Sequence, residues 1–530
     1  MTALSLINRA LNQIPKRAER QEGPRLHETF VDSGVADVLD TVDHQVLYGR
    51  RGTGKTHALS YLAAEAESRG DVALNIDLRT VGSNDGILDP ESASPADRAA
   101  RLLVDLLGQL HDSLLSAVMR DDSLIEDAKF IDKADALLAA ITSIRVSGDV
   151  ERVTEAEAKA GDKNSSSLKA SLSKMPGVEA TLVSESSSEG RGLLRETRRG
   201  TERIALNFSD VARSMRELAS TLSSRRVWLL LDEWSSVPRD LQPYLAEFLQ
   251  RCVLPLQRVT LKVAAIEQQT NFRAEVNGRL VGVELGADMG AHINLDDFLV
   301  YEGNEDQSRA FFRGLFFKHL NSLPGEDQLS VDGLHAPYDV VSLGFTDSRA
   351  FDELVRAAEG VPRDALYIAA KAASRAGQEK ISVPLVREAA RSWYQTDKSR
   401  PLESREEAQR LLMWIIDKII REKRARAFLV NARDARNPLL LALFDARVLH
   451  IVRRGYSAQD QPGERFDVWV IDYGAYVDLL QTKNAPRGAL GVGVEGGVEE
   501  YVDIDVPLQD LRAIRRAILD LMEFEASTGV

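Results

Sequence analysis

The sequence predicts an α/β protein with a parallel β-sheet, followed by an all-helical segment and a small C-terminal module. Three observations lead to this fold class. Buried-strand patterns alternate with helical patterns over residues 44–300, apolar residues recur with a helical period over residues 301–400, and a helix–helix–hairpin pattern follows. Alternating strands and helices are typical of a parallel sheet with helices on its faces.

Length, charge and cysteine content narrow the class of protein. A chain of 530 residues exceeds what one hydrophobic core supports and indicates roughly two to four domains. The net charge of -14 argues against a protein that coats nucleic acid with its whole surface, although one basic face is compatible with it. The single cysteine, Cys252, excludes an intramolecular disulfide and a thiolate metal cluster, and fits a cytoplasmic protein. No signal-peptide pattern is seen and no apolar run reaches the roughly 18–20 residues of a membrane span, so we expect no membrane association.

The first elements follow from local patterns. Residues 1–43 are polar with a helical pattern, and His44–Tyr48 is an apolar run typical of a buried strand. A helix (HALSYLAAEAESRG), a second strand (DVALNIDL) and a helical stretch over residues 95–144 come next. Residues 148–205 are rich in Ser, Gly and charge, which indicates an insertion into the core, either flexible or a weak β-hairpin.

After the insertion, the alternation resumes up to residue 300. The patterns predict a helix over Phe208–Leu222, a buried strand over Val227–Leu231, a helix over Asp240–Arg251 and a strand over Leu261–Ile266. These elements complete the α/β core, and residues 301–400 then follow as an all-helical domain.

A new unit begins after Pro401. It starts with the helix REEAQRLLMWIIDKIIREKRA and continues with the helical stretch PLLLALFDARV. Two strand-like runs, VLHIVRRGY and FDVWVIDYG, flank a turn. This outline predicts a winged-helix-like domain over residues 401–484, and residues 485–530 form a Gly-rich acidic tail that ends in an amphipathic helix.

A phosphate-binding pattern lies directly after the first strand. The pattern G-x-x-x-x-G-K-[ST] is matched at every defined position by Gly49, Arg50, Arg51, Gly52, Thr53, Gly54, Lys55 and Thr56. Glycines let several backbone N–H groups point at phosphate oxygens, and the next helix presents its positive end. Lys55 would reach the β- and γ-phosphates of ATP and Thr56 would bind Mg2+. His57, in the first helical turn behind them, completes the set of residues expected to bind the cofactor.

A second half of the site comes from the sequence VWLLLDEW. This buried strand delivers Asp232 to its C-terminal edge, where ligands bind in open α/β sheets. Asp232 would hold Mg2+, and Glu233 would polarise the attacking water. Together with the phosphate loop, the Asp–Glu pair predicts a P-loop NTPase that hydrolyses ATP.

In these motifs the chain resembles the AAA+ ATPases, and within them the initiator-like clade related to origin-recognition ATPases. The resemblance covers roughly residues 25–480 and rests on GRRGTGKT (Walker A), LLLDEW (Walker B), LKVAAI and Gly360-Val361-Pro362-Arg363. It implies that residues 301–400 form a helical lid over the nucleotide and that the protein assembles into a homo-oligomer. It also implies that Arg363, as second sensor, contacts the γ-phosphate, which suits a permanently charged, bidentate side chain.

Two features depart from the family pattern. The strand Leu261–Ile266 should end in a polar residue that orients the lytic water, but the sequence continues Glu267-Gln268-Gln269. Glu267 aligns best, although a second carboxylate near phosphate is electrostatically unfavourable, and Gln268 is the alternative. The arginine that a neighbouring subunit usually contributes is either Arg273 or Arg279.

The C-terminal module is locally basic. Between Lys418 and Arg465 there are eleven Lys and Arg residues against five Asp and Glu residues, a local charge of +6 in a chain of -14. Winged helices bind duplex DNA with a helix in the major groove and the hairpin on the backbone. The residues expected to neutralise phosphates are Lys418, Arg424, Arg426, Arg453 and Arg454. A basic run can equally be the solvated end of a helix, and winged helices also bind proteins.

Two functions remain after these observations. The first is an oligomerising ATPase whose nucleotide state controls engagement of DNA. The second is a regulatory nucleotide switch of the signal-transduction type, for example in bacterial anti-phage defence, that acts on an effector protein. The insertion at residues 148–205 and the lack of any nuclease or protease pattern favour this alternative. A kinase or transferase is disfavoured by the Asp–Glu pair and the long helical lid.

Overall fold

The fold is given by a computed structural model. It describes residues 4–21, 23–82, 94–120, 130–141, 144–147, 150–155, 180–186, 193–204, 207–222, 225–290, 293–299, 305–323, 331–423, 425–457, 463–480, 514 and 516–528. The chain divides into two compact units. Unit 1 comprises Met1–Arg69, Lys262–Thr270 and Gly290–Val530, and unit 2 comprises Gly70–Leu261 and Asn271–Met289.

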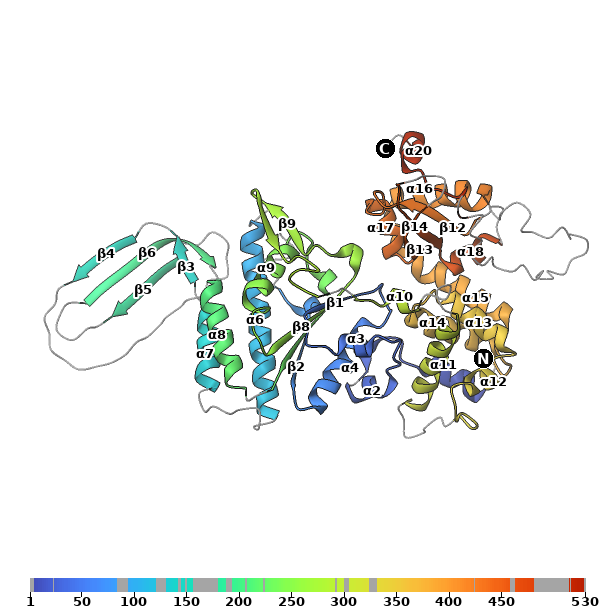
Figure 1. The fold of residues 1–530 in the computed structure, drawn as a ribbon, viewed down its shortest axis with the longest axis horizontal. Coiled ribbons are helices and arrows are strands. Elements are labelled where there is room, and N and C mark those ends of the chain that lie inside the picture. The colour runs from blue at the N-terminus through green and yellow to red at the C-terminus, as the bar shows by residue number, and fades with distance from the viewer. Residues whose placement is uncertain are drawn as a thin grey trace, which may run out of the picture. The chain divides into compact units, whose positions relative to one another are not determined.

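A five-stranded sheet carries the α/β core (Figure 1). Its strands, in the order in which they are hydrogen-bonded, are β11 (Ile293–Asn294), β1 (Gln45–Tyr48), β8 (Val259–Ala265), β7 (Val227–Asp232) and β2 (Val72–Asp77). The pairs β1–β11, β1–β8 and β2–β7 are parallel. Every residue of β1, β7 and β8 is buried, as continuous apolar strands of a parallel sheet require. The predicted α/β class with a parallel sheet is confirmed.

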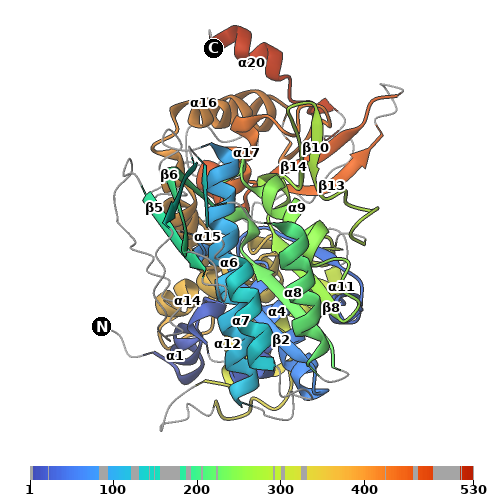
Figure 2. The same cartoon turned by 90° about the vertical axis from the view of Figure 1, so that its left-hand side faces the viewer.

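Unit 2 packs long helices beside β2 and β7. These are α6 (Pro95–Arg120), α7 (Phe130–Ile141), α8 (Phe208–Ser220) and α9 (Gln242–Cys252). Helices α6, α7 and α8 lie side by side (Figure 2), and α6 also contacts β2 and α9. By length and composition alone α6 could span a membrane, but its apolar side chains, such as Leu103 and Leu107, are buried within this unit. A hairpin of β9 (Arg273–Val276) and β10 (Arg279–Gly282) completes the unit.

The predicted insertion contains β-structure. The strands are β3 (Ile144–Ser147), β4 (Val150–Glu155), β5 (Ala180–Ser186) and β6 (Leu193–Ile204). Each of β3, β4 and β5 pairs antiparallel with β6, so the hairpin alternative predicted from sequence describes the pairing of β5 with β6. The other residues of the segment 148–205 lie outside the described ranges.

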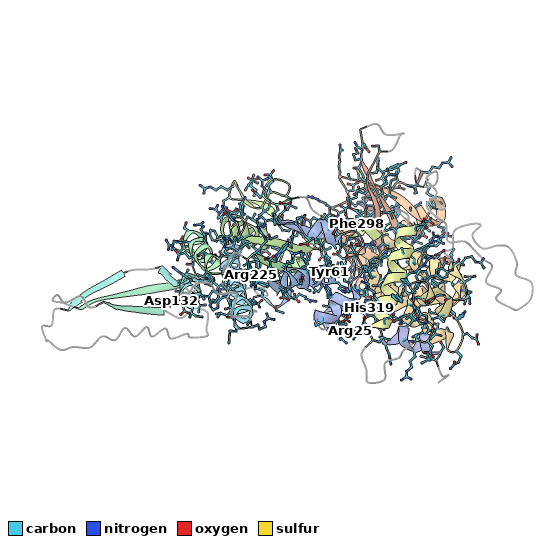
Figure 3. All side chains as sticks on the ribbon, turned by 60° about the horizontal axis from the view of Figure 1, so that its bottom comes forward. Arg25, Tyr61, Asp132, Arg225, Phe298 and His319 are labelled. Carbon is cyan, nitrogen blue, oxygen red and sulfur yellow. The ribbon has the colours of Figure 1, made fainter. Side chains whose placement is uncertain are left out.

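Unit 1 begins with short helices around the phosphate loop. These are α1 (Leu6–Gln13), η1 (Ala18–Arg20), α2 (Gly23–Thr29), α3 (Ala36–Leu39) and α4 (Lys55–Ser68). Their contacts are partly aromatic: Tyr61 of α4 stacks on Phe30 with 4.1 Å between ring centroids, and His57 meets His319 edge-on. Tyr61 and His319 are labelled in Figure 3. Burial lowers the pKa of His319 to about 3, so this histidine is neutral.

The lid of unit 1 is helical, as predicted. It consists of α10 (Asp296–Leu299), α11 (Glu305–Asn321), α12 (Asp339–Gly344), α13 (Ser348–Ala357), α14 (Pro362–Ala376) and α15 (Val383–Trp393). Asp347 caps α13 by accepting a hydrogen bond from the backbone N of Ala350, and Pro362 stands in the first turn of α14. A π-helical segment, η6 (Tyr394–Lys398), and the short helix η7 (Arg400–Leu402) lead out of the lid.

The C-terminal module contains a small antiparallel sheet between helices. Its elements are α16 (Glu406–Trp414), η8 (Ile415–Arg421), β12 (Ala427–Asn431), α17 (Pro438–Asp445), β13 (Leu449–Tyr456), β14 (Phe466–Ile471) and α18 (Tyr473–Leu480). The strand order is β12-β14-β13. The sequence patterns missed β12, because its apolar run directly follows a basic helix end. Beyond it, Leu429 of β12 forms backbone hydrogen bonds with Ala517 and Leu519, shortly before α20 (Leu521–Thr528).

One hydrophobic core joins α1, the lid and the C-terminal module. It includes Leu11 of α1, Phe312 and Phe351 of the lid, and Trp469 and Tyr473 of the module, all buried. These side chains belong to one contiguous cluster, so the lid and the module share a hydrophobic core within unit 1.

Candidate functional site: a phosphate loop and the residues that surround it

The phosphate loop connects β1 to α4, which is the arrangement that the sequence predicts. Gly52 and Gly54 have φ angles of 90° and 99°, where L side chains are strained. A Cβ atom on Gly49 would lie 2.5 Å from Oγ1 of Thr53. Glycine is therefore required at these positions by backbone conformation or by close approach, and the wrapped backbone suits a polyanion.

Lys55 closes the loop on itself. Its side chain is buried, and Nζ donates to the carbonyl oxygens of Gly49 at 2.9 Å and Arg50 at 3.1 Å. Thr53 Oγ1 donates to the same Arg50 oxygen at 2.9 Å. The ammonium group is thus held within the curve of the loop at the start of α4, where an anion is favoured.

His57 faces away from this curve. Its Nε2 lies 2.5 Å from the carbonyl oxygen of Leu26 in α2, and its ring packs edge-on against Phe30. Burial lowers its pKa. The predicted place of His57 in the first helical turn is correct, and its side chain contacts α2.

The donor set of the loop fits a nucleotide phosphate with Mg2+. A lysine ammonium, a helix N-terminus and the hydroxyl of Thr56 are the groups that this chemistry uses. Mg2+ usually retains waters and is bound by one or two protein oxygens plus substrate phosphates. No cluster of three or more His, Cys, Asp or Glu side chains that could bind a metal occurs in the described part of the chain.

In unit 2, the Asp–Glu pair stands at the end of β7. Asp232 is largely buried, and its Oδ1 accepts a hydrogen bond from the backbone N of Glu233 at 2.8 Å. Glu233 has a φ of 56°, a left-handed conformation that costs a non-glycine residue about 1 kcal/mol or more. The next residue, Trp234, is fully buried and stacks on Phe272, which holds the turn in place. Strain of this kind is typical of functional sites.

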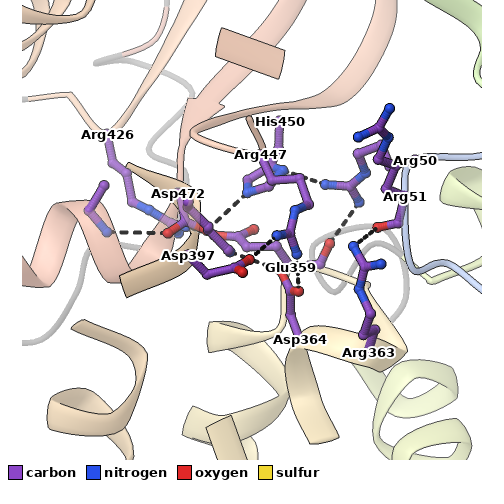
Figure 4. A network of polar contacts seen from close by, with 12 residues as sticks. Arg50, Arg51, Glu359, Arg363, Asp364, Asp397, Arg426, Arg447, His450 and Asp472 are labelled. Carbon is purple, nitrogen blue, oxygen red and sulfur yellow. Dashed lines mark hydrogen bonds and ion pairs between the residues drawn. The ribbon is translucent and has the colours of Figure 1, made fainter. Parts of the chain in front are cut away.

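Arg363 lies against the phosphate loop. From the first turn of α14 its backbone N donates to the Gly52 carbonyl oxygen and its Nη2 to that of Arg51, both at 3.3 Å (Figure 4). A Cβ atom on Gly52 would lie 2.7 Å from Nε of Arg363. Burial and the charge of Arg447 lower the pKa of Arg363, and a bound anion would offset both effects.

Glu267 follows β8, and its carboxylate is bonded to the C-terminal module. Its Oε1 accepts from Arg454 Nη1 at 2.6 Å, and its Oε2 from Asn294 Nδ2 at 3.3 Å. The arginine compensates the charge that made a carboxylate unfavourable at this position. Gln268, the alternative, occupies the same short helix η5 (Glu267–Gln269).

The guanidinium of Arg50 is directed away from the curve of the loop. The group is buried and donates to Asp296, His450 and the carbonyl oxygen of Glu359. Its backbone N also donates to Asp296, at 3.1 Å. Among the residues predicted to bind the cofactor, Arg50 therefore holds the loop, whereas the side chain of Arg51 is exposed.

The five basic residues predicted to contact DNA have different surroundings. Arg426 is buried and forms an ion pair with Glu359, so its guanidinium is not on the surface and the prediction for it is wrong. Lys418 is partly exposed, pairs with Glu422 and lies over the ring of Trp414. Arg453 and Arg454 are exposed on β13, where Arg454 binds Glu267. Arg424 lies outside the described residues.

The two candidates for an intersubunit arginine lie on the β9–β10 hairpin of unit 2. Both side chains are exposed, and Arg273 pairs with Glu284 at 2.5 Å.

The fold and the loop define a P-loop NTPase. No family model and no curated protein matches the chain. Among solved structures, the chain is similar to Cdc6p from Pyrobaculum aerophilum, with a TM-score of 0.31 and 12% identity over 88% of this chain and 94% of that one. It is also similar to the Aeropyrum pernix Orc1 protein, solved in complex with DNA, with a TM-score of 0.30, 13% identity and the same coverage.

Proposed function

We propose that the protein is an AAA+ ATPase that binds and hydrolyses ATP and couples its nucleotide state to oligomerisation and to engagement of duplex DNA. The observation that carries the ATPase assignment is the packing of Arg363 on the loop that holds Lys55. Two cationic side chains from different domains meet at a backbone shaped for phosphate, and a γ-phosphate is the ligand that would bind both.

In this proposal each residue has one task. Lys55 and the backbone of residues 49–56 bind the β- and γ-phosphates. Thr56 and Asp232 would hold Mg2+, which would supply charge neutralisation at the transferred phosphoryl group. Glu233 accepts a proton from the attacking water. Arg363 stabilises negative charge on the γ-phosphate, and Arg273 or Arg279 of a neighbouring copy would complete the site in an oligomer.

The Glu267–Arg454 bond supports coupling to DNA. Glu267 stands at the first-sensor position after β8, and Arg454 is one of two exposed arginines on β13. A DNA phosphate that takes the Nη1 donor of Arg454 displaces Glu267, because this nitrogen holds the carboxylate. DNA engagement then changes the charge and freedom of a residue in the ATPase site, and nucleotide state changes the availability of Arg454.

The test uses full-length protein with ATP and a duplex DNA. Wild type should bind and hydrolyse ATP, and Lys55→Ala should bind none. The double variant Arg453→Glu, Arg454→Glu should lower DNA affinity at least about tenfold and reduce its salt dependence. The matched control Arg349→Glu, Arg375→Glu reverses the same charge on α13 and α14 and should leave DNA affinity unchanged. Turnover that survives in Lys55→Ala would contradict the ATPase assignment.

One observation favours the alternative, a nucleotide switch that acts on an effector protein. A surface groove on the C-terminal module has an apolar, net acidic lining, which consists of Met413, Trp414, Phe524, Glu406, Asp417, Gln409 and the single basic residue Arg410. Carboxylates repel DNA, whereas this mixture suits a protein segment with apolar and basic residues. Absence of salt-sensitive DNA binding in the wild type, with ATPase activity intact, would favour this function over DNA engagement.

A further inference from the structure

Arg50 occupies a position of the phosphate loop that phosphate binding leaves open to any side chain. Its guanidinium is nevertheless only 3% exposed. Nε donates to Asp296 Oδ1 at 2.8 Å, Nη2 to the Glu359 carbonyl oxygen at 2.7 Å, and Nη1 to His450 Nδ1 at 2.5 Å. These three acceptors come from the segment after β11, from the end of the lid helix α13 and from β13 of the C-terminal module.

Burial of the Arg50 guanidinium costs hydration free energy, which is offset only when its N–H donors form hydrogen bonds within the protein. A guanidinium removed from water loses several kcal/mol of hydration unless all its donors find acceptors. Arg51, the next residue, is exposed, so the loop itself does not demand burial of an arginine. The side chain of Arg50 is therefore fixed by its three partners, and through it they fix the backbone at the start of the loop.

The contact between Arg50 and His450 determines the proton on the histidine. Arginine is always a donor, so Nδ1 of His450 must be the acceptor and the proton resides on Nε2. This Nε2 lies 3.1 Å from Oδ2 of Asp472 and donates to it. Burial and the charge of Arg50 lower the pKa of His450 to about 4, which agrees with a neutral ring.

From Asp472 the contacts return to the lid. Lys398 Nζ lies 2.5 Å from Asp472 Oδ2 and 2.9 Å from Asp364 Oδ2, and all three side chains are buried. Lys398 ends the π-helical segment η6, a distortion that often marks functional positions. Asp364 also forms an ion pair with Arg447, which in turn pairs with Asp397.

The path ends beside Arg363 of α14, which contacts the loop from the lid (Figure 4). Asp364 directly follows Arg363, whose backbone and side chain bond to the loop at Gly52 and Arg51. The cations of this network are Arg50, Arg363, Lys398 and Arg447, and the anions are Asp296, Asp364, Asp397 and Asp472. The four positive and four negative charges balance only when Arg363 is included. The charge of Arg363 helps to lower the pKa of Asp364, so a bound phosphate and Asp364 would compete for this arginine.

We infer that Arg50 and His450 are positioning residues of the phosphate loop, and that His450 makes the C-terminal module a part of the nucleotide site. The inference rests on the proposed function, since it assigns these residues to ATP binding. His450 holds Arg50, Arg50 holds the start of the loop, and the Asp472–Lys398–Asp364 path links the same histidine to Arg363. The module thereby senses both sides of the bound phosphate chain.

The test compares full-length wild type with His450→Leu, His450→Asn and Arg50→Ala in steady-state ATPase assays and in binding of a fluorescent ATP analogue. His450→Leu removes the acceptor for Arg50 and should raise KM for ATP at least about tenfold, while kcat at saturation changes less than about threefold. His450→Asn places an amide oxygen close to the position of Nδ1 and should restore KM to within about threefold of wild type. Arg50→Ala should resemble His450→Leu, and the double variant should add little to either, because both break one contact.

The controls separate this inference from the proposed function. His335→Asn changes an exposed histidine in the segment before α12 and should leave KM unchanged. A wild type that neither binds nor hydrolyses ATP would refute the proposed function. A wild type with normal turnover in which His450→Leu keeps the wild-type KM, or loses thermal stability with no change in KM, would refute the positioning role alone. Should His450→Leu not fold, the KM values of His450→Asn and Arg50→Ala decide: a near wild-type KM in the first together with a raised KM in the second supports the inference, and a wild-type KM in both overturns it.

Discussion

The phosphate loop and the basic segment of the C-terminal module each contain one buried arginine and one exposed arginine. In the loop, Arg50 is buried and Arg51 is exposed. In the module, Arg426 is buried against Glu359, whereas Arg453 is exposed. Burial of Arg50 does not affect the proposed phosphate site, because the backbone of the loop forms that site. Burial of Arg426 removes a predicted DNA contact, because that contact required an exposed side chain. A basic side chain can bind an external ligand only where it is not already held in a buried ion pair with an acidic residue.

The loop side of this comparison is tested most strongly at Glu233. We expect Glu233→Gln to lower the rate of ATP hydrolysis about 10²- to 10⁴-fold, because the amide cannot accept the proton of the attacking water. ATP binding should persist, since Glu233 holds neither phosphate nor Mg2+ in this proposal. Single-turnover hydrolysis and ATP retention on the protein measure the two effects separately. Unimpaired turnover would remove Glu233 from its role.

The module side is tested by removing a buried arginine and an exposed one. Arg426→Ala leaves the Glu359 carboxylate buried without its partner, and we expect a loss of about 3–5 kcal/mol in the free energy of unfolding. Arg453→Ala removes an exposed side chain and should cost less than about 0.5 kcal/mol. Urea unfolding of both variants gives the comparison. Equal effects would mean that the burial of Arg426 is not what distinguishes the two residues.

Acid should destabilise unit 1 through its neutral histidines. The pKa of His450 is about 4 in the folded protein, below its ordinary value near 6.5, so the unfolded chain binds a proton that the folded chain excludes between these pH values. Stability is therefore full above about pH 6.5 and falls towards pH 4, by at most about 1.4 kcal/mol per pH unit for one group. His319, whose pKa is also lowered, adds to the same window. Unfolding curves from pH 7 to 4 should be flatter for His450→Asn than for wild type, and a parallel pair of curves would exclude His450 as a contributor.

The smallest expected effect concerns the contact between the two regions. Glu267→Gln weakens the acceptor for Arg454, which leaves this arginine freer to bind a DNA phosphate. The pair is partly exposed, so its contribution is at most about 1 kcal/mol, equivalent to about fivefold in affinity. We expect DNA affinity to rise by up to this factor at low salt, measured by fluorescence anisotropy. A fall in affinity would indicate that Glu267 orients Arg454 toward DNA and does not compete for it.

Prediction from sequence succeeded where a pattern is local. The buried strand before the loop, the glycines at Gly52 and Gly54, and the Asp–Glu pair after a run of apolar residues each follow from a few adjacent residues. The strand β12 was missed for the same reason, because its short apolar run has neighbours that read as a continuing helix. The ion pairs of Arg426 and Glu267 could not be predicted, since their partners stand 67 and 187 residues away along the chain.

The sequence by itself determined the parallel α/β class and the phosphate loop, and it predicted the residues that would bind ATP and Mg2+. These properties depend on backbone conformation and on hydrophobic periodicity, which are set within one strand, one turn or one helix. Only the tertiary structure decided that Arg50 is tied to His450, that Arg363 lies on the loop and that Arg454 is bound to Glu267. Ion pairs and buried hydrogen bonds require groups from distant segments to meet in a shared low-dielectric environment, and no local pattern encodes which groups will meet.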